Sequence, residues 1–232
     1  MVYLVANLKS QLNHSQASDW LEKVVPLPPI SSSKLKVVIC PTFTQVSIFK
    51  DNLESLSAPC TVGAQTVSSH PAGKHTGDVP ASALQNLVTH CLVGHSERRS
   101  SYQETDRDVS IQSRHLIDHK ITPIICFDQS NLDTQIKDLK TQKINPLSCL
   151  FAYEPVSAIG TGQPESPDIA ENVAMKLVSL VGQPVTILYG GSVSPQNISS
   201  FLEKPHLNGV LVGSNSLDPL IFKKLIKLSN EA

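Results

Sequence analysis

An apolar strand, a single carboxylate and a glycine-rich loop follow one another in Ala152-Tyr153-Glu154-Pro155-Val156-Ser157-Ala158-Ile159-Gly160-Thr161-Gly162. The residues from Leu150 to Tyr153 are apolar or aromatic, so Glu154 stands where a buried strand emerges, a position that suits a carboxylate to act as a base. Gly160 and Gly162 can adopt positive φ angles and present bare amides to an anion. The stretch predicts a catalytic base followed by a lid. An ordinary loop acid paired with an arginine is the weaker alternative, because of the strand before it.

Eight short apolar runs recur about every 23 to 36 residues, and most are too short to be buried helices. The segments between them usually contain one stretch of helical periodicity. The runs are Val2 to Ala6, Lys36 to Cys40, Thr61 to Ala64, His90 to Val93, Thr122 to Phe127, Leu150 to Tyr153, Thr186 to Tyr189 and Gly209 to Val212. Strand and helix alternating eight times predict an α/β fold, a closed parallel (β/α)8 barrel, and we expect residues 1–232 to form one domain.

Three Pro-containing pairs mark expected helix starts. Ser166-Pro167-Asp168 places a capping hydroxyl, a proline at the first helical position and an acid in the first turn. Ser194-Pro195 and Asp218-Pro219 repeat the pattern. The connection from Gln129 to Pro146 is brief and polar, so we expect a short helix at about Leu132 to Leu139.

Composition narrows the classes of partner. Hydrophobic residues make up 40% of the 232 residues and the net charge is −1, with no basic stripe that would neutralise a nucleic acid backbone. No apolar run is long enough to cross a membrane, and the first residues lack the charged region of a signal peptide. The five cysteines contain no CxxC pair, which favours reduced thiols in a cytoplasmic enzyme without a zinc site.

The active site of such a barrel lies at the carboxyl ends of the strands, so the residues that follow each run are the candidates. They bring one cation, one imidazole, one carboxylate and three glycine-containing loops to the same end. They are Asn7 and Lys9, Gly94-His95-Ser96-Glu97-Arg98-Arg99, Glu154, Gly190-Gly191-Ser192, and Gly213-Ser214-Asn215.

Each candidate also has an ordinary structural interpretation. A lone lysine after a strand is usually a solvated charge, but Glu97 on another loop could be the buried counter-ion that keeps Lys9 inside a pocket. His95 alone could be a structural histidine, but Ser96-Glu97-Arg98 resembles a helix start, whose amides favour a neutral ring that donates to a carbonyl. Paired glycines are most often tight turns, yet two such loops after the last two strands form the usual phosphate site of this architecture.

At these residues the chain resembles the triosephosphate isomerase family over nearly its whole length. The matching motifs are Asn7-Leu8-Lys9, Gly94-His95-Ser96-Glu97-Arg98-Arg99, Ala152-Tyr153-Glu154-Pro155, Tyr189-Gly190-Gly191-Ser192 and Val212-Gly213. The resemblance implies a TIM barrel, a triose phosphate substrate, no cofactor and no metal, and a place in glycolysis and gluconeogenesis. The general scheme of a glutamate base, a neutral histidine and a closing lid is the family's own.

The resemblance also implies a role for each residue. Glu154 would be the base, His95 would donate to the carbonyl oxygen, and Lys9 and Asn7 would stabilise and position the negative oxygens. Glu97 and Ser96 would support them. The phosphate would be held by amides of Gly160, Ser192, Gly213 and Ser214.

Several residues in and near the expected site depart from the family's usual pattern. Ser157 stands where the lid hinge usually has Trp, which predicts a lid that closes less firmly. Ser214 replaces a second glycine after the eighth strand, so its side chain either crowds or contacts the phosphate. Asp128 and Gln129 replace the usual Gly-Glu, a change that the sequence does not explain.

The segment Gly73 to Pro80 resembles the protruding third loop with which family members interlock as homodimers. His75 replaces the usual aromatic residue and Asp78 the usual Glu. Thr76 would approach the partner's active site.

Two other interpretations stay open. One is a barrel that binds a phosphate without turnover, which the presence of Lys9, His95 and Glu154 together disfavours. The other is a different sugar-phosphate isomerase on the same barrel, which the close match of the His95 and Glu154 segments disfavours.

Overall fold

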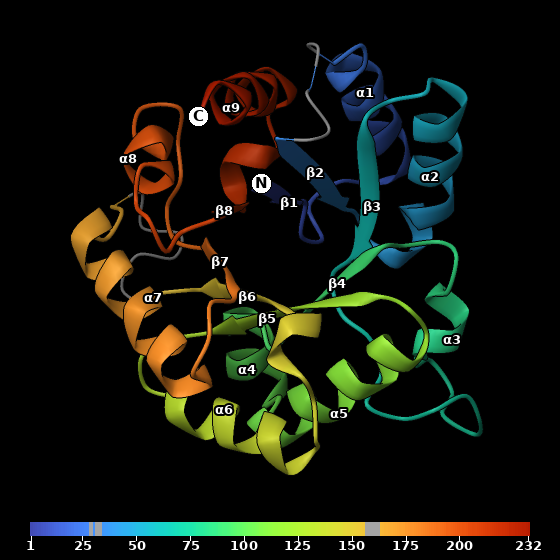
Figure 1. The fold of residues 1–232 in the computed structure, drawn as a ribbon. Helices are drawn as coiled ribbons and strands as arrows, with labels where there is room; N and C mark the ends of the chain where they lie inside the picture. Colours follow the sequence, from blue (N-terminus) through green and yellow to red (C-terminus); the bar gives the residue numbers. More distant parts are fainter. Residues whose placement is uncertain (28–29, 31–33, 156–162) are drawn as a thin grey trace.

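Eight parallel strands close into a barrel in the computed structural model, which describes residues 1–27, 30, 34–155 and 163–232. Each strand pairs with its neighbours in chain order, and β1 closes the ring on β8. Figure 1 shows the helices arranged around the strands. The strands are β1 (Val2–Asn7), β2 (Leu35–Cys40), β3 (Cys60–Ala64), β4 (His90–Val93), β5 (Thr122–Phe127), β6 (Leu150–Tyr153), β7 (Thr186–Tyr189) and β8 (Gly209–Val212).

The connections within the described ranges are α-helices and three short 3₁₀ turns. The helices are α1 (His14–Val24), α2 (Val46–Ser55), α3 (Ala81–Leu84), α4 (Ser96–Tyr102), α5 (Asp106–Asp118), α6 (Leu132–Thr141), α7 (Pro167–Val181), α8 (Ile198–Leu202) and α9 (Pro219–Glu231). The turns are η1 (Phe43–Gln45), η2 (Pro146–Ser148) and η3 (Ser214–Ser216). None of the helices described here is both long and apolar enough to cross a bilayer.

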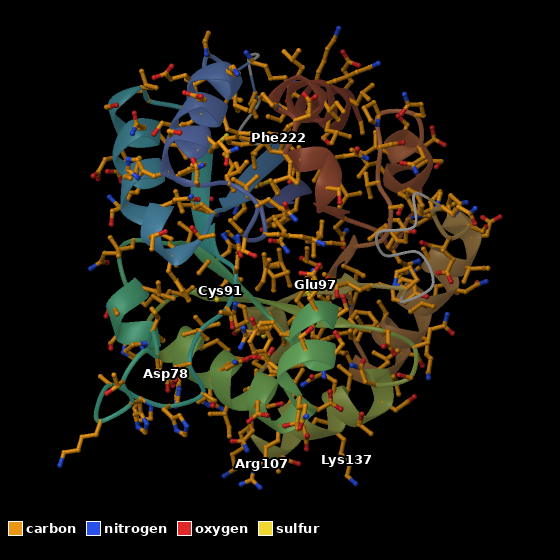
Figure 2. All side chains as sticks on the ribbon, turned by 180° about the vertical axis from the view of Figure 1, so that it is seen from behind. Asp78, Cys91, Glu97, Arg107, Lys137 and Phe222 are labelled. Carbon is orange, nitrogen blue, oxygen red and sulfur yellow. The ribbon has the colours of Figure 1, made fainter. Side chains whose placement is uncertain are left out.

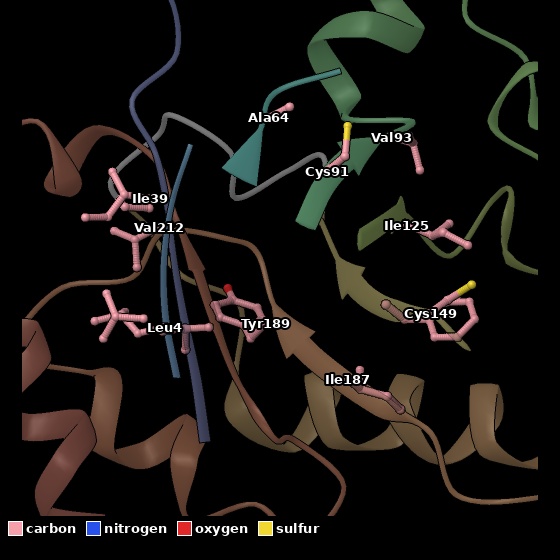
Figure 3. Packing of buried hydrophobic residues seen from close by; sticks show 14 of the residues in the cluster. Leu4, Ile39, Ala64, Cys91, Val93, Ile125, Cys149, Ile187, Tyr189 and Val212 are labelled. Carbon is pink, nitrogen blue, oxygen red and sulfur yellow. The ribbon is translucent and has the colours of Figure 1, made fainter. Parts of the chain in front are cut away.

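Alternation along the strands divides the core into two layers. Val5, Val38 and Leu92 point into the barrel with the other members of a small buried cluster. The intervening residues, such as Leu4, Ile39 and others shown in Figure 3, point outward and pack against the helices in a larger cluster. Burial on both faces explains why the strands appear in the sequence as continuous apolar runs rather than alternating ones.

The sequence predictions of the eight strands are confirmed, with shifts of one residue at three ends. Ser166 and Asp218 cap α7 and α9, each with proline in the first turn, as expected. The helix start at Ser194-Pro195 was wrong, because α8 begins at Ile198 and residues 195–197 form a turn. The helix expected at Leu132 to Leu139 exists as α6 and extends to Thr141.

Candidate active site

A pocket of about 250 Å³ opens at the carboxyl ends of the strands. Asn7, Lys9, His95 and Glu154, which the sequence analysis singled out, all line it. The segments after β7 and β8, which the sequence analysis also singled out, line the same pocket. Their lining residues are Gly190, Gly191, Ser192, Val193, Ser194, Gly213, Ser214 and Asn215.

Glu154 follows β6 directly, and its side chain is almost completely buried. Its Oε2 atom accepts a hydrogen bond from the Ser96 amide at 2.8 Å, and its Oε1 atom lies 3.3 Å from His95 Nε2. The Cys126 thiol also donates to this carboxylate, and burial together with the Glu154 charge raises the thiol pKa well above its ordinary value. A buried carboxylate that lines a pocket can accept a proton from a bound molecule.

His95 caps α4, so the peptide dipoles of that helix point their positive end at the imidazole. Its Nδ1 atom accepts a hydrogen bond from the Glu97 amide at 3.2 Å. The proton of a neutral ring therefore lies on Nε2, the atom that faces Glu154. This tautomer can donate a hydrogen bond to a carbonyl oxygen in the pocket.

Lys9 lies just past β1 in a left-handed backbone conformation, with φ of 52°. Asn7 Oδ1 accepts from the Lys9 amide at 3.0 Å, and Lys9 Nζ lies 2.5 Å from Glu97 Oε1. Glu97 was expected to be a buried counter-ion, and that was wrong, because its side chain is 52% exposed. A short helix places Glu97 at the pocket rim, where the ion pair orients the ammonium while water screens it.

The two loops after β7 and β8 are held by side-chain amides. Asn197 Nδ2 donates to the Ser192 carbonyl at 2.9 Å, and Asn215 Nδ2 donates to the Val193 carbonyl. A Cβ atom on Gly213 would lie 3.2 Å from Lys9 Cε, so a side chain there would press on the lysine. Ser214 begins η3, which sets a short helical turn beside the pocket.

Sequence reasoning missed Gln65 and Asn197. Gln65 Nε2 donates to the carbonyls of Lys9 and Cys40, at 2.8 and 2.9 Å, and so holds the unusual backbone of Lys9. Its position directly after the third strand was an available signal. Asn197 carried no such signal, because only the folded turn brings it back to Ser192.

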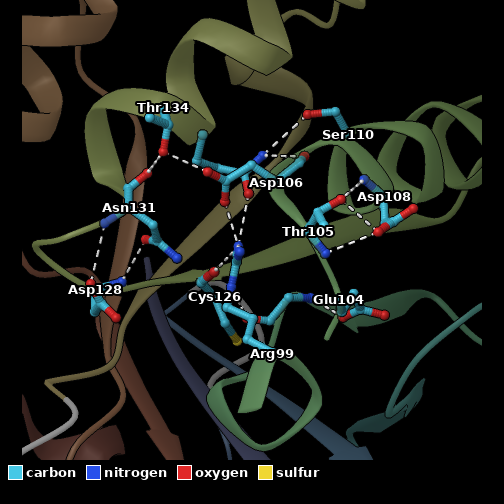
Figure 4. A network of polar contacts seen from close by, with 12 residues as sticks. Arg99, Glu104, Thr105, Asp106, Asp108, Ser110, Cys126, Asp128, Asn131 and Thr134 are labelled. Atoms are coloured by element: carbon cyan, nitrogen blue, oxygen red, sulfur yellow. Dashed lines mark hydrogen bonds and ion pairs between the residues drawn. The ribbon is translucent and has the colours of Figure 1, made fainter. Parts of the chain in front are cut away.

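A buried polar network behind the pocket joins the loops that carry the His95 and Glu154 segments. Arg99 donates to the Gly94 carbonyl at 2.7 Å, to the Cys126 carbonyl at 3.2 Å, and to Asp106 at 2.7 Å (Figure 4). Glu104 accepts from the Gly94 amide and from Arg98, both at 3.0 Å. The network therefore fixes Gly94, the residue before His95, against the end of β5.

The structure also accounts for the unusual Asp128-Gln129 pair. Asp128 Oδ1 accepts from the amides of Ser130 and Asn131 and tightens the turn before α6. Gln129 Nε2 donates to the Tyr153 hydroxyl at 2.9 Å, and that hydroxyl donates to Glu165 at 2.8 Å. This chain of hydrogen bonds anchors the segment after residue 162 to the strand that leads to Glu154.

Gly160, expected to bind the phosphate, and Ser157, expected in the lid, lie outside the described residues. Among the side chains that the structure describes, no cluster of His, Cys, Asp or Glu has the composition of a metal site.

Comparison with known proteins matches this architecture and site to one family. The family model described as triosephosphate isomerase matches residues 2–229. A triosephosphate isomerase of Polynucleobacter asymbioticus is 34% identical, over 94% of this chain and 96% of the relative. Those of Solibacter usitatus and Nocardia farcinica are each 33% identical, over 96% and 92% of this chain and 97% and 91% of the relatives. The chain belongs to the triosephosphate isomerase family.

Proposed function

We infer that this chain interconverts dihydroxyacetone phosphate and D-glyceraldehyde 3-phosphate without a cofactor, through an enediolate. One observation carries the inference: a buried carboxylate, an imidazole and an ammonium line one pocket of about 250 Å³. A base beside a hydrogen-bond donor and a cation is what proton abstraction next to a carbonyl requires. The loops after β7 and β8 line the same pocket.

Glu154 removes a proton from the carbon next to the carbonyl. The electrons of that C–H bond form the carbon–carbon double bond, and the carbonyl oxygen becomes negative. His95 Nε2–H donates to this oxygen, and Lys9 stabilises the charge while Asn7 holds the Lys9 backbone. His95 gives its Nε2 proton to this oxygen and takes the proton of the neighbouring hydroxyl in exchange. Glu154 returns its proton to the adjacent carbon, and the oxygen that lost its proton becomes the new carbonyl, which completes the exchange of aldose and ketose.

The base has to leave its present partner before it can act. Glu154 Oε2 accepts from the Ser96 amide at 2.8 Å, which satisfies the carboxylate when no substrate is present. Substrate binding therefore moves Glu154 from the Ser96 amide toward the reacting carbon. Ser96 acts as a positioning residue for the resting state of the base.

The phosphate binds at the loops after β7 and β8. Amides of Ser192, Gly213 and Ser214 serve as donors, with Gly160 completing the site. The support is architectural, because the loops after strands seven and eight and a short extra helix commonly form the phosphate site of this fold. Here η3 is such a helix.

A coupled assay of dihydroxyacetone phosphate formation tests the proposal on the wild-type chain and on Glu154→Gln. The amide keeps the size of the side chain but cannot act as a base, so kcat should fall by about 10²–10⁴-fold. Glu203→Gln, the same substitution at an exposed position on the far end of α8, is the matched control and should retain activity. A folded wild type that binds a phosphate ligand but gives no turnover would refute the isomerase and support a binding module.

We also propose a homodimer, formed through the loop from Gly73 to Pro80. The loop projects from the body of the molecule (Figure 2, at Asp78), and residues 71–78 are all exposed in the single chain. Thr76 lies near its tip and would approach the partner's active site. Sedimentation analysis should give twice the chain mass, and loss of the dimer in a variant with residues 73–78 shortened would assign the interface.

We also propose that the reaction takes place in the cytoplasm. The support is chemical, because all five cysteines are free and four of them are buried. Fractionation of cells that carry a tagged chain tests this placement.

A further inference from the structure

A second polar cavity, of about 560 Å³, lies at the opposite end of the barrel from the candidate active site. Its lining includes residues at the start of five strands, β1 to β5, and in the turns before some of them. The residues at the strand starts that matter here are Tyr3, Lys36, Thr61, His90 and Thr122, and Lys120 lies in the turn before β5. The reaction proposed above uses none of them.

Tyr3 and His90 form the floor of this cavity. Tyr3 pairs with Lys36 in the β1–β2 register, and both belong to the inward-pointing set that continues with Val5 and Val38. The Tyr3 ring meets the His90 ring edge to face across the barrel, with centroids 6.1 Å apart. These side chains therefore close the amino-terminal mouth of the barrel beneath its apolar interior.

His90 is a buried polar group with one nitrogen unused. Its side chain is 8% exposed, and Nδ1 contacts the Thr89 hydroxyl at 2.7 Å. Within the described part of the chain, no hydrogen bond engages Nε2. Burial, and then the charge of Lys36, lower the pKa of His90 to about 4, so the ring is neutral near pH 7. A neutral imidazole with one free nitrogen can still donate to or accept from a ligand.

The charge around the cavity is positive. Lys36, Lys50 and Lys120 contribute three ammonium groups, and Glu54 is the one carboxylate in the lining. Glu54 lies 2.6 Å from Lys50 and neutralises it. Among the described residues, Lys36 and Lys120 have no carboxylate partner. Lys36 instead lies over the Tyr3 ring, 5.5 Å from its centroid.

We propose that this cavity is a binding site for a phosphorylated small molecule larger than a triose phosphate. Two uncompensated ammonium groups suit the multiple charges of a phosphate ester, since lysine binds phosphate as a point charge. The cavity has about twice the volume of the pocket proposed to hold a triose phosphate, and falls in the size range of ligand sites. The unused nitrogen of His90 and the Thr61 and Thr122 hydroxyls line the same space for polar groups of the ester.

Calorimetric titration with two probes tests the site. Adenosine diphosphate matches both the charge and the volume of the cavity, whereas inorganic pyrophosphate matches the charge alone. The double variant Lys36→Gln/Lys120→Gln should weaken binding of adenosine diphosphate at least tenfold. Lys224→Gln removes one positive charge from an exposed position on α9 outside the cavity, and should leave binding unchanged.

The candidate active site can also attract anions, so Lys9→Met is titrated as well. A site at the amino-terminal mouth is retained in Lys9→Met and lost in the Lys36/Lys120 variant. The ring nitrogens of His90, followed by NMR, should shift when adenosine diphosphate is added to wild type. Equal binding by the double variant and by Lys224→Gln, or an unperturbed His90 ring at saturation, would overturn the proposal. Failure of the isomerase assay leaves these results unaffected, because they involve no turnover.

Discussion

Acidification should destabilise this fold through His90. The pKa of His90 falls from its ordinary 6.5 to about 4 because the ring is buried and faces Lys36. The unfolded chain therefore takes up a proton near pH 6.5, while the folded chain stays neutral until about pH 4. Stability contributed by the neutral ring is complete above pH 6.5 and is lost as the pH falls through this window. The difference corresponds to about 3 kcal/mol of unfolding free energy.

Urea denaturation at a series of pH values, at fixed protein concentration, measures this loss. Trp20 is the single tryptophan and is 3% exposed, packed between Phe49 and Phe222, so its fluorescence reports unfolding of the helix layer. His90→Asn removes the titrating group and keeps a polar partner for Thr89. The other ionisable groups are the same in both proteins, so their contributions cancel in the difference.

Wild type should lose about 3 kcal/mol more than His90→Asn between pH 6.5 and pH 4. Lys36→Gln should show a smaller loss than wild type, because one of the two causes of the lowered pKa is removed. Parallel curves for wild type and His90→Asn would refute the reasoning, since the ring would then titrate alike in the folded and unfolded chains.

Three further substitutions test the site and its support. Lys9→Met should lower kcat/KM by about 10²–10³-fold without lowering Tm, because the side chain keeps nearly its length and loses its charge. A steady-state assay measures kcat/KM, and a melting curve measures Tm. Gly191→Ala places a Cβ 2.2 Å from the Tyr189 hydroxyl, so it should lower the free energy of unfolding by about 1–3 kcal/mol, measured by urea denaturation. Gly73→Ala is the control, because the nearest atom to its Cβ is 3.8 Å away, and it should lower that free energy little. Glu104→Ala leaves the Gly94 amide without its hydrogen-bond acceptor and should lower the free energy of unfolding by about 3 kcal/mol in the same assay.

The barrel and most of its site could be predicted because they depend on local patterns. Apolar runs followed by Lys9, His95 and Glu154 place each group at a strand end, and parallel strands bring those ends together. Ser194-Pro195 misled the helix prediction because Asn197 Oδ1 accepts from the Ser194 amide at 2.8 Å and stabilises a turn before the helix.

Other features depend on contacts between segments far apart in the sequence. Glu97 pairs with Lys9 as expected, but its exposure follows from where a short helix leaves the barrel rim. The hydrogen bond from Gln65 to the Lys9 carbonyl joins residues that are 56 positions apart in the sequence. The pKa of His90 depends on which face of β4 points inward and on Lys36 from another strand. Such long-range geometry is not encoded in any local pattern.

The most direct test of the central claim is the fate of the transferred hydrogen. Glyceraldehyde 3-phosphate is converted in deuterium oxide by wild type and by Glu154→Gln, and NMR follows both the product and its deuterium content. If Glu154 is the base of an enediolate pathway, it either returns the abstracted proton or first exchanges it with solvent, so deuterium enters wild-type product only on the carbon that receives the proton. Isomerisation and any exchange should fall together in the variant. Undiminished isomerisation or undiminished exchange by Glu154→Gln would contradict the account.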